Sequence, residues 1–174
     1  MRAWRLTAAI VLTIGISIIP GGAALAAGCH VDGTIGTDTF LWECTNGNDT
    51  LVSGPQKDVV PFQGGADTGT HGAGGDDVGG GSGNDLIRGQ AGNDSLEGGS
   101  GSDRMVGGAG QDELIDNPTG DTDRVCDGEG VDTIDVQDGD GNDTIYLNAD
   151  GVAEASVLRD SGDSMVVQTC PFST

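Results

Sequence analysis

The chain is poor in aromatic and basic side chains. Only 3% of its 174 residues are aromatic, and seven Lys and Arg stand against 28 Asp and Glu, which gives a formal charge of -21. So few large apolar side chains leave little material for a conventional packed core, and the 33 glycines raise the entropic cost of ordering the chain. The charge makes nucleic acid and anionic membrane surfaces poor partners, whereas a cation is a natural one.

Histidine is also scarce, with His30 and His71 as its two instances. Neither lies in a pattern with a nucleophile and an orienting group, as a hydrolytic triad requires. The glycine-rich strings lack the Lys and the following helix of a phosphate-binding loop. We therefore expect no enzymatic activity, and we expect His71 to be an exposed loop residue.

The N-terminus carries the sequence's one long apolar run, Leu6–Ile19, which follows a basic start. Pro20 breaks it, and Ala24-Leu25-Ala26, which fits the small-x-small rule for cleavage, comes next. This order is typical of an export signal, and it predicts cleavage after Ala26 or Ala27. A membrane anchor is the alternative, but the run is short and small residues follow it. We predict a secreted mature chain of charge -23, without a membrane span.

Four cysteines follow this segment: Cys29, Cys44, Cys126 and Cys170. An even number in an exported chain indicates two disulfides. Three pairings are possible, and we favour Cys29–Cys44 with Cys126–Cys170, one at each end of the region between them. A lipid anchor on Cys29 is the competing hypothesis, because Ala26–Cys29 resembles a weak lipoprotein cleavage box. Lipidation would leave an odd number of cysteines.

A nine-residue period runs from Cys44 to Ile115, eight times without a slip. Its clearest stretch, Gly80–Ile115, reads GGSGNDLIR, GQAGNDSLE, GGSGSDRMV, GGAGQDELI. Such a fixed period predicts stacked repeats and outranks local helix or strand signals. Position 6 is always Asp, namely Asp49, Asp58, Asp67, Asp76, Asp85, Asp94, Asp103 and Asp112. Position 8 is aliphatic or Met except at Gly69, and comprises Leu51, Val60, Val78, Ile87, Leu96, Met105 and Leu114.

The period slips twice beyond Ile115. Two extra residues, Asp116 and Asn117, precede units 118–126 and 127–135, and Val136-Gln137 precedes unit 138–146. Outside the repeats we expect a short strand at Thr39–Trp42 and a hairpin turn at Asp160–Asp163. The predicted organisation is a signal peptide (1–27), an N-terminal cap (28–43), a repeat region (44–146) and a C-terminal cap (147–174).

Each unit is expected to be a loop of about six residues followed by a strand of about three. Glycine lets the loop turn tightly, which can point main-chain carbonyls inward, and position 6 adds a carboxylate. These are the hard oxygen ligands that Ca²⁺ prefers. If two units close one coil, aspartates of alternate units stack roughly 4.8 Å apart. Two such carboxylates repel by about 3 kcal/mol at an effective dielectric near 20, so metal binding and folding should be coupled.

The repeat resembles the RTX calcium-binding nonapeptide family, also called hemolysin-type calcium-binding repeats, with the pattern GGxGxDxUx. The resemblance implies an all-β fold, a parallel β-roll (right-handed β-solenoid), with several Ca²⁺ ions between alternate loops. The best pairs are Asp85 with Asp103 and Asp94 with Asp112. The first loops are weaker, because Pro55 and Gln56 replace expected residues. Carried over by position, the metal ligands are Asp49, Asp67, Asp76, Asp85, Asp94, Asp103, Asp112, Asp132 and Asp143, with Gly83, Gly92, Gly101 and Gly110.

The chain departs from the larger family members, which carry a catalytic or pore-forming domain and no N-terminal signal. Two functional hypotheses follow. The first is a secreted, non-enzymatic calcium-binding protein. The second is a cell-surface adhesion or assembly module, lipid-anchored at Cys29 in one version, that displays a calcium-stabilised roll. An exposed aromatic or apolar patch on one side would favour the second. The sequence names no protein partner.

Overall fold

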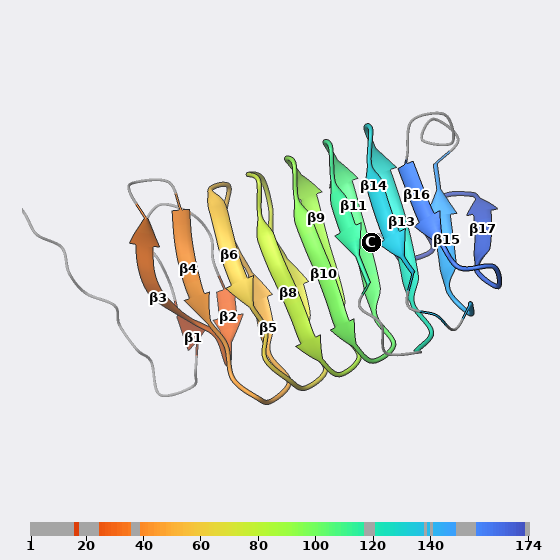
Figure 1. Cartoon of the computed structure of the whole chain (residues 1–174). Helices are drawn as coiled ribbons and strands as arrows, with labels where there is room; N and C mark the ends of the chain where they lie inside the picture. The colour runs from red at the N-terminus through yellow and green to blue at the C-terminus, as the bar shows by residue number, and fades with distance from the viewer. Residues whose placement is uncertain are drawn as a thin grey trace, which may run out of the picture.

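The protein is a β-solenoid of about six turns, with two parallel sheets facing each other (Figure 1). The computed structural model describes residues 16–17, 25–35, 39–116, 121–137, 139, 141–148 and 156–172. These residues form strands and turns without a helix, and therefore include no helix that could cross a membrane. The predicted all-β parallel roll is confirmed.

From β4 onward, successive strands alternate between the two sheets, so each sheet collects every second unit. One sheet has the order β1-β2-β5-β7-β9-β11-β13-β15-β17. Its strands are β1 (Ile16–Ser17), β2 (Leu25–Ala27), β5 (Thr50–Val52), β7 (Thr68–Thr70), β9 (Leu86–Ala91), β11 (Arg104–Ala109), β13 (Arg124–Glu129), β15 (Thr144–Leu147) and β17 (Ser164–Val167). The other has the order β16-β14-β12-β10-β8-β6-β4-β3. Its strands are β3 (His30–Ile35), β4 (Thr39–Glu43), β6 (Lys57–Pro61), β8 (Asp77–Ser82), β10 (Ser95–Ser100), β12 (Glu113–Ile115), β14 (Thr133–Val136) and β16 (Ser156–Arg159).

Strand register shows that two nonapeptides close one coil. Leu96 lies between Val78 and Leu114, eighteen residues away on either side. The step becomes twenty residues at β11, where Arg104 pairs with Arg124. This confirms the slip after Ile115, because the two extra residues lengthen the coil while the strands stay aligned. The pairing of β13 with β15 keeps the longer step, as the second slip predicts.

The central strands are longer than expected. β8, β9, β10 and β11 each have six residues, from position 7 of one unit to position 3 of the next. The prediction of a six-residue loop and a three-residue strand is therefore wrong for these units, and positions 4–6 alone form the turn. The reason is that positions 1–3 still pair with the same positions one coil away, as Gly99 and Gly81 do.

The core is a row of position-8 side chains between the sheets. Leu51, Val60, Ile87, Leu96, Met105 and Leu114 are fully buried. The gap at Gly69 is filled by its neighbours, because a Cβ there would lie 2.4 Å from His71 Nε2 and 3.0 Å from Phe62. The expectation that His71 is exposed is wrong, since its exposed fraction is 0%. His71 stands at position 1 of its unit, and its side chain faces inward beside Gly69, which has no side chain. Burial lowers the pKa of His71 to about 4.

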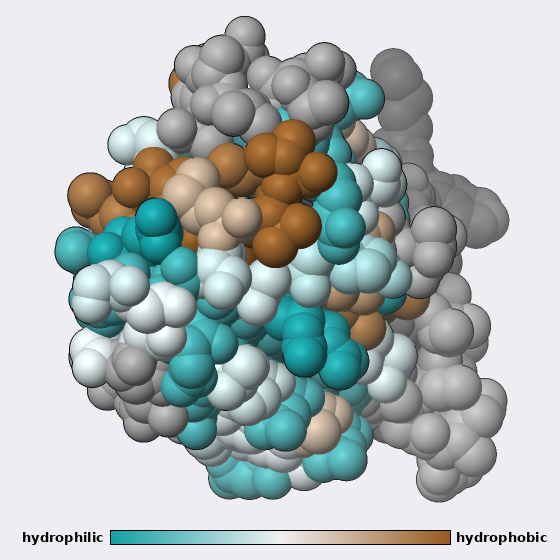
Figure 2. Space-filling view, turned by 90° about the vertical axis from the view of Figure 1, so that its right-hand side faces the viewer, coloured by the Kyte–Doolittle hydropathy of each residue, from teal (hydrophilic) through white to brown (hydrophobic). Residues whose placement is uncertain are grey.

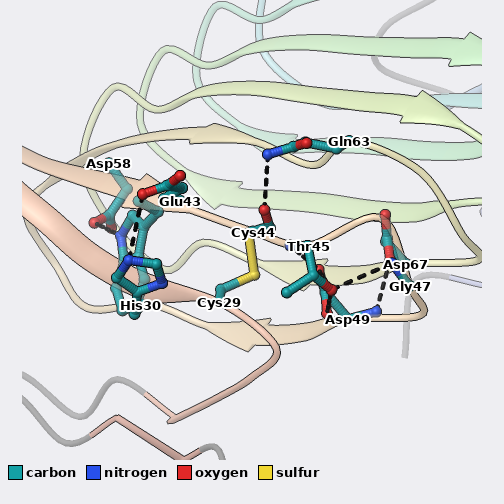
Figure 3. Close-up of a disulfide and its surroundings, with 11 residues drawn as sticks. Cys29, His30, Glu43, Cys44, Thr45, Gly47, Asp49, Asp58, Gln63 and Asp67 are labelled. Atoms are coloured by element: carbon teal, nitrogen blue, oxygen red, sulfur yellow. Dashed lines mark hydrogen bonds and ion pairs between the residues drawn. A yellow bond between two sulfur atoms is a disulfide. The ribbon is translucent and has the colours of Figure 1, made fainter.

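Each end carries one of the predicted disulfides. Cys29 bonds to Cys44 and Cys126 bonds to Cys170. Near the first, Gln63 Nε2 donates to the Cys44 carbonyl at 2.8 Å and so fastens the second coil to the disulfide (Figure 3). The expected strand at Thr39–Trp42 is confirmed as part of β4.

The C-terminal segment does not form the predicted hairpin. β16 pairs in parallel with β14 in one sheet, and β17 pairs in parallel with β15 in the other. The turn at Asp160–Asp163 therefore continues the solenoid. A turn motif between two short apolar runs fits a hairpin and a solenoid corner equally well, and the free edges of β14 and β15 select the corner.

Much of the predicted signal peptide falls outside the described residues. Within it, β2 pairs antiparallel with β5. The cleavage site stays a prediction.

Candidate metal centre

The position-6 aspartates form two columns, one at each lateral edge of the solenoid. Every one from Asp49 to Asp112 is buried, with an exposed fraction of 3% or less. From Asp67 onward, each Oδ1 accepts the N–H of the aspartate one coil earlier, so Asp85 N–H donates to Asp103 Oδ1 at 2.8 Å and Asp94 N–H donates to Asp112 Oδ1 at 2.9 Å. The predicted stacking of alternate units is thus confirmed, with carboxylates held by backbone donors.

The columns extend beyond the predicted repeats. Asp103 N–H donates to Asp123 Oδ1, Asp123 N–H to Asp143 Oδ1, and Asp143 N–H to Asp163 Oδ1. Asp163 was not predicted, although the twenty-residue spacing from Asp103 through Asp143 leads to it. In the other column, Asp112 N–H donates to Asp132 Oδ1 at 2.9 Å.

The second carboxylate oxygen of the ladder is left without a partner. Oδ2 is buried and accepts no hydrogen bond in Asp58, Asp67, Asp76, Asp85, Asp94, Asp103, Asp112 and Asp132. A buried, unpaired polar oxygen costs free energy, and an ionised one costs more. The repetition of the same orphaned atom along both columns points to a ligand common to all of them.

Glycine at position 1 gives this oxygen its space. A Cβ on Gly80 would lie 2.7 Å from Asp85 Oδ2 and 2.3 Å from the Gly98 carbonyl oxygen. A Cβ on Gly89 would lie 2.2 Å from Asp94 Oδ2 and 2.7 Å from the carbonyl oxygen of Gly107. At each point a carboxylate oxygen and a carbonyl from the next coil converge. Such a set of hard oxygen donors fits Ca²⁺.

Glycine at position 4 lets the turns stack. Gly83, Gly92, Gly101 and Gly110 all have φ between 117° and 153°, which side chains rarely adopt. A Cβ on Gly92 would lie 1.3 Å from the Gly74 carbonyl oxygen. These glycines therefore hold consecutive turns in backbone contact, and their predicted role as carbonyl ligands stays a prediction.

Burial raises the pKa values of the stacked aspartates. Desolvation raises the pKa of Asp76, Asp103 and Asp112 to about 7 and that of Asp85 to about 6. The backbone N–H that each carboxylate accepts lowers the pKa, and neighbouring aspartates raise it again. The stacked carboxylates thus resist ionisation near neutral pH unless positive charge is supplied.

The first coil provides protein donors for both oxygens of Asp49 and for one oxygen of Asp58. Thr45 donates its N–H to Asp49 Oδ2 at 2.7 Å and its hydroxyl to Asp49 Oδ1 at 2.9 Å (Figure 3). Trp42 Nε1 donates to Asp58 Oδ1 at 2.8 Å. Asp49 was predicted as a metal ligand, but the structure gives both of its oxygens protein donors.

The fold and these turns define a β-solenoid with buried acidic corners. Residues 79–114 match the family model of the RTX calcium-binding nonapeptide repeat, in four copies. These residues are therefore RTX nonapeptide repeats, which confirms the resemblance in the stretch where the period is clearest. Neither the curated proteins nor the solved structures contain a significant match to the chain.

Proposed function

We propose that the protein is a secreted, non-enzymatic calcium-binding β-roll in which Ca²⁺ between stacked turns completes the fold. The observation that carries this proposal is the row of buried Oδ2 atoms without hydrogen-bond partners. The RTX repeats at residues 79–114 support calcium as the ion.

The residues suited to hold the ions are the stacked pairs of the central coils. Asp85 with Asp103 and Asp94 with Asp112 supply carboxylates, and the carbonyls of Gly98 and Gly107 lie beside them. Bound calcium would supply positive charge where the carboxylates repel one another. Because the paired turns exist only in the folded chain, the binding free energy then contributes to folding.

Circular dichroism of the full chain tests this proposal. In excess chelator we expect the β signal to be largely lost, and millimolar Ca²⁺ should restore it cooperatively. Mg²⁺ at the same concentration is the control, since it demands a smaller octahedral site and dehydrates reluctantly. An identical spectrum with calcium and with chelator would contradict the coupling.

The assembly module is the second candidate, and one surface favours it. Figure 2 looks onto the C-terminal end of the solenoid and shows apolar side chains gathered in a band across its upper part. Leu158, Met165 and Val167 of β16 and β17 are 49%, 43% and 58% exposed. Sedimentation of the calcium-loaded chain tests it: self-association that Met165→Asp abolishes would support assembly, and a monomer at high concentration would oppose it.

The lipid-anchored version requires a free sulfur on Cys29. That sulfur is bonded to Cys44 in the structure. We therefore propose free secretion, which mass spectrometry of the exported chain would test by the absence of a lipid mass.

A further inference from the structure

We propose that Asp103, Asp116 and Asp123 form a three-carboxylate calcium site, the tightest in the roll. The proposal rests on the proposed calcium binding and adds a ligand from outside the nonapeptide motif. Asp116 belongs to the two-residue insertion after Ile115, which the repeat pattern leaves without a role.

The backbone places Asp116 at an inward-facing position. Its N–H donates to the Asp135 carbonyl at 2.8 Å, as the N–H of His71, at position 1 of its unit, donates to the Arg88 carbonyl at 2.9 Å. Eighteen residues earlier, position 1 is Gly98, where a Cβ would lie 2.8 Å from Asp103 Oδ2. A side chain at this position is therefore directed toward the aspartate column.

The three side chains do come together. One carboxylate oxygen from each of Asp103, Asp116 and Asp123 lies within 4.8 Å of the others. Their exposed fractions are 1%, 6% and 1%. Asp103 Oδ1 accepts the Asp85 N–H, whereas its Oδ2 is buried and accepts no hydrogen bond. That unpartnered oxygen is independent of the clustering and indicates a missing ligand.

A comparison with Asp127 shows that an inward-facing aspartate alone does not make such a site. Asp127 opens unit 127–135 and, with an exposed fraction of 1%, is also buried. Its Oδ1 accepts the N–H groups of Gly128 and Asn148 at 2.6 and 3.0 Å. Backbone donors thus already satisfy Asp127. Asp116 instead joins a stacked pair and brings that site to three carboxylates.

The number of carboxylate ligands is the reason to expect that this site binds calcium most tightly. The stacked pairs of the central coils offer two carboxylates and backbone carbonyls, and a third carboxylate adds one more negative ligand. Calcium affinity in oxygen sites rises with ligand charge and site rigidity. Three buried carboxylates repel one another strongly without an ion, so the site gains more than its neighbours when calcium enters.

Calorimetric calcium titration of the full chain tests the site. Asp116→Gly restores the residue found at position 1 of the central units and should fold in saturating calcium. We expect it to lose the tightest binding step, with affinity at least about tenfold weaker, while the weaker steps remain. Asp77→Asn, which removes an exposed charge on β8, is the matched control and should keep every step.

The outcomes separate the site from the proposed function. A wild-type chain that takes up no calcium would sink both. A wild-type chain that binds calcium and folds, with an unchanged tightest step in Asp116→Gly, would overturn this site alone. If Asp116→Gly stays unfolded in saturating calcium, Asp116→Glu and Asp116→Asn decide. The proposal requires that Asp116→Glu folds and keeps the tightest calcium-binding step, and that Asp116→Asn loses this step. Equal calcium binding by the two variants overturns it.

Discussion

The first coil, residues 44–61, and the central coils, residues 80–115, share one nine-residue period but differ in the hydrogen-bond donors that reach their aspartates. In the first coil Thr45 donates to both oxygens of Asp49, and Trp42 donates to Asp58. In the central coils no side chain takes this role, and Oδ2 of Asp94 is buried without a hydrogen bond. The first coil thus gives both oxygens of Asp49 and one oxygen of Asp58 protein donors, whereas the central coils leave Oδ2 of their aspartates without one.

The residues at position 1 also differ between the first coil and the central coils. The first coil places Cys44 and Ser53 there, and both are buried. In the central coils position 1 is glycine, which leaves the space beside Oδ2 open. The comparison teaches that the same backbone turn can present a carboxylate to protein donors, as at Asp49, or leave open space beside its Oδ2, as at Asp94.

Metal removal should break the comparison most visibly. In excess chelator, amides of β9–β11 should exchange with deuterium within seconds, because their turns keep unneutralised carboxylates. Amides of β4 and β6 should exchange more slowly, since the disulfide Cys29–Cys44 and Trp42 hold this region without metal. Hydrogen exchange with mass spectrometry measures both, and uniform exchange along the chain would refute the contrast.

Acid should partly replace calcium in the central coils. The folded-state pKa of Asp76, Asp103 and Asp112 is raised from 3.8 to about 7, so the folded chain binds protons more tightly than the unfolded one. The resulting stability is fully present below pH 3.8 and is lost as the pH rises through about 7. We expect metal-free protein, prepared by gel filtration, to gain β signal between pH 8 and pH 4.5. A signal that stays flat or falls would oppose this.

Single substitutions sharpen the comparison at one position of the motif. Asp94→Ala removes a carboxylate from the stacks with both Asp76 and Asp112, so it should weaken two neighbouring sites and raise the calcium midpoint of folding several-fold. Asp49→Ala should raise the midpoint less, because it removes only the Thr45 hydrogen bonds, about 1 kcal/mol each, and no unpartnered oxygen. Equal shifts in the two titrations would remove the distinction.

The smallest expected effect is local to one turn. Gln90 has φ of 81° and is the one non-glycine residue with positive φ in the described part of the chain. Gly81, Gly99 and Gly108 hold the same position in neighbouring units. Gln90→Gly should therefore stabilise the calcium-loaded protein by about 1 kcal/mol, as relief of left-handed strain exceeds the added chain entropy. Gln111→Gly, without positive φ, should not stabilise, and denaturant unfolding in calcium compares them.

Much of the fold was predictable because the period is strict. The buried column at position 8 and the coil of two units follow from counting and spacing, whereas the cysteine count left three pairings open, of which the favoured one is confirmed. His71 was missed, because its burial depends on the space that the missing side chain of Gly69, two residues earlier, leaves in the core. The corner at Asp160–Asp163 was missed because local turn chemistry does not say which strand edges are free.

The sequence by itself determined the repeat, the acidic columns and the slips of two residues, since each is a matter of position along the chain. The tertiary structure alone decided which oxygens already have donors. Thr45 satisfies Asp49 within one turn, whereas Asp103, Asp116 and Asp123 meet only because the longer coil returns to the same edge. Hydrogen bonding and coordination depend on distances between coils, and these exist only once the strands are in register.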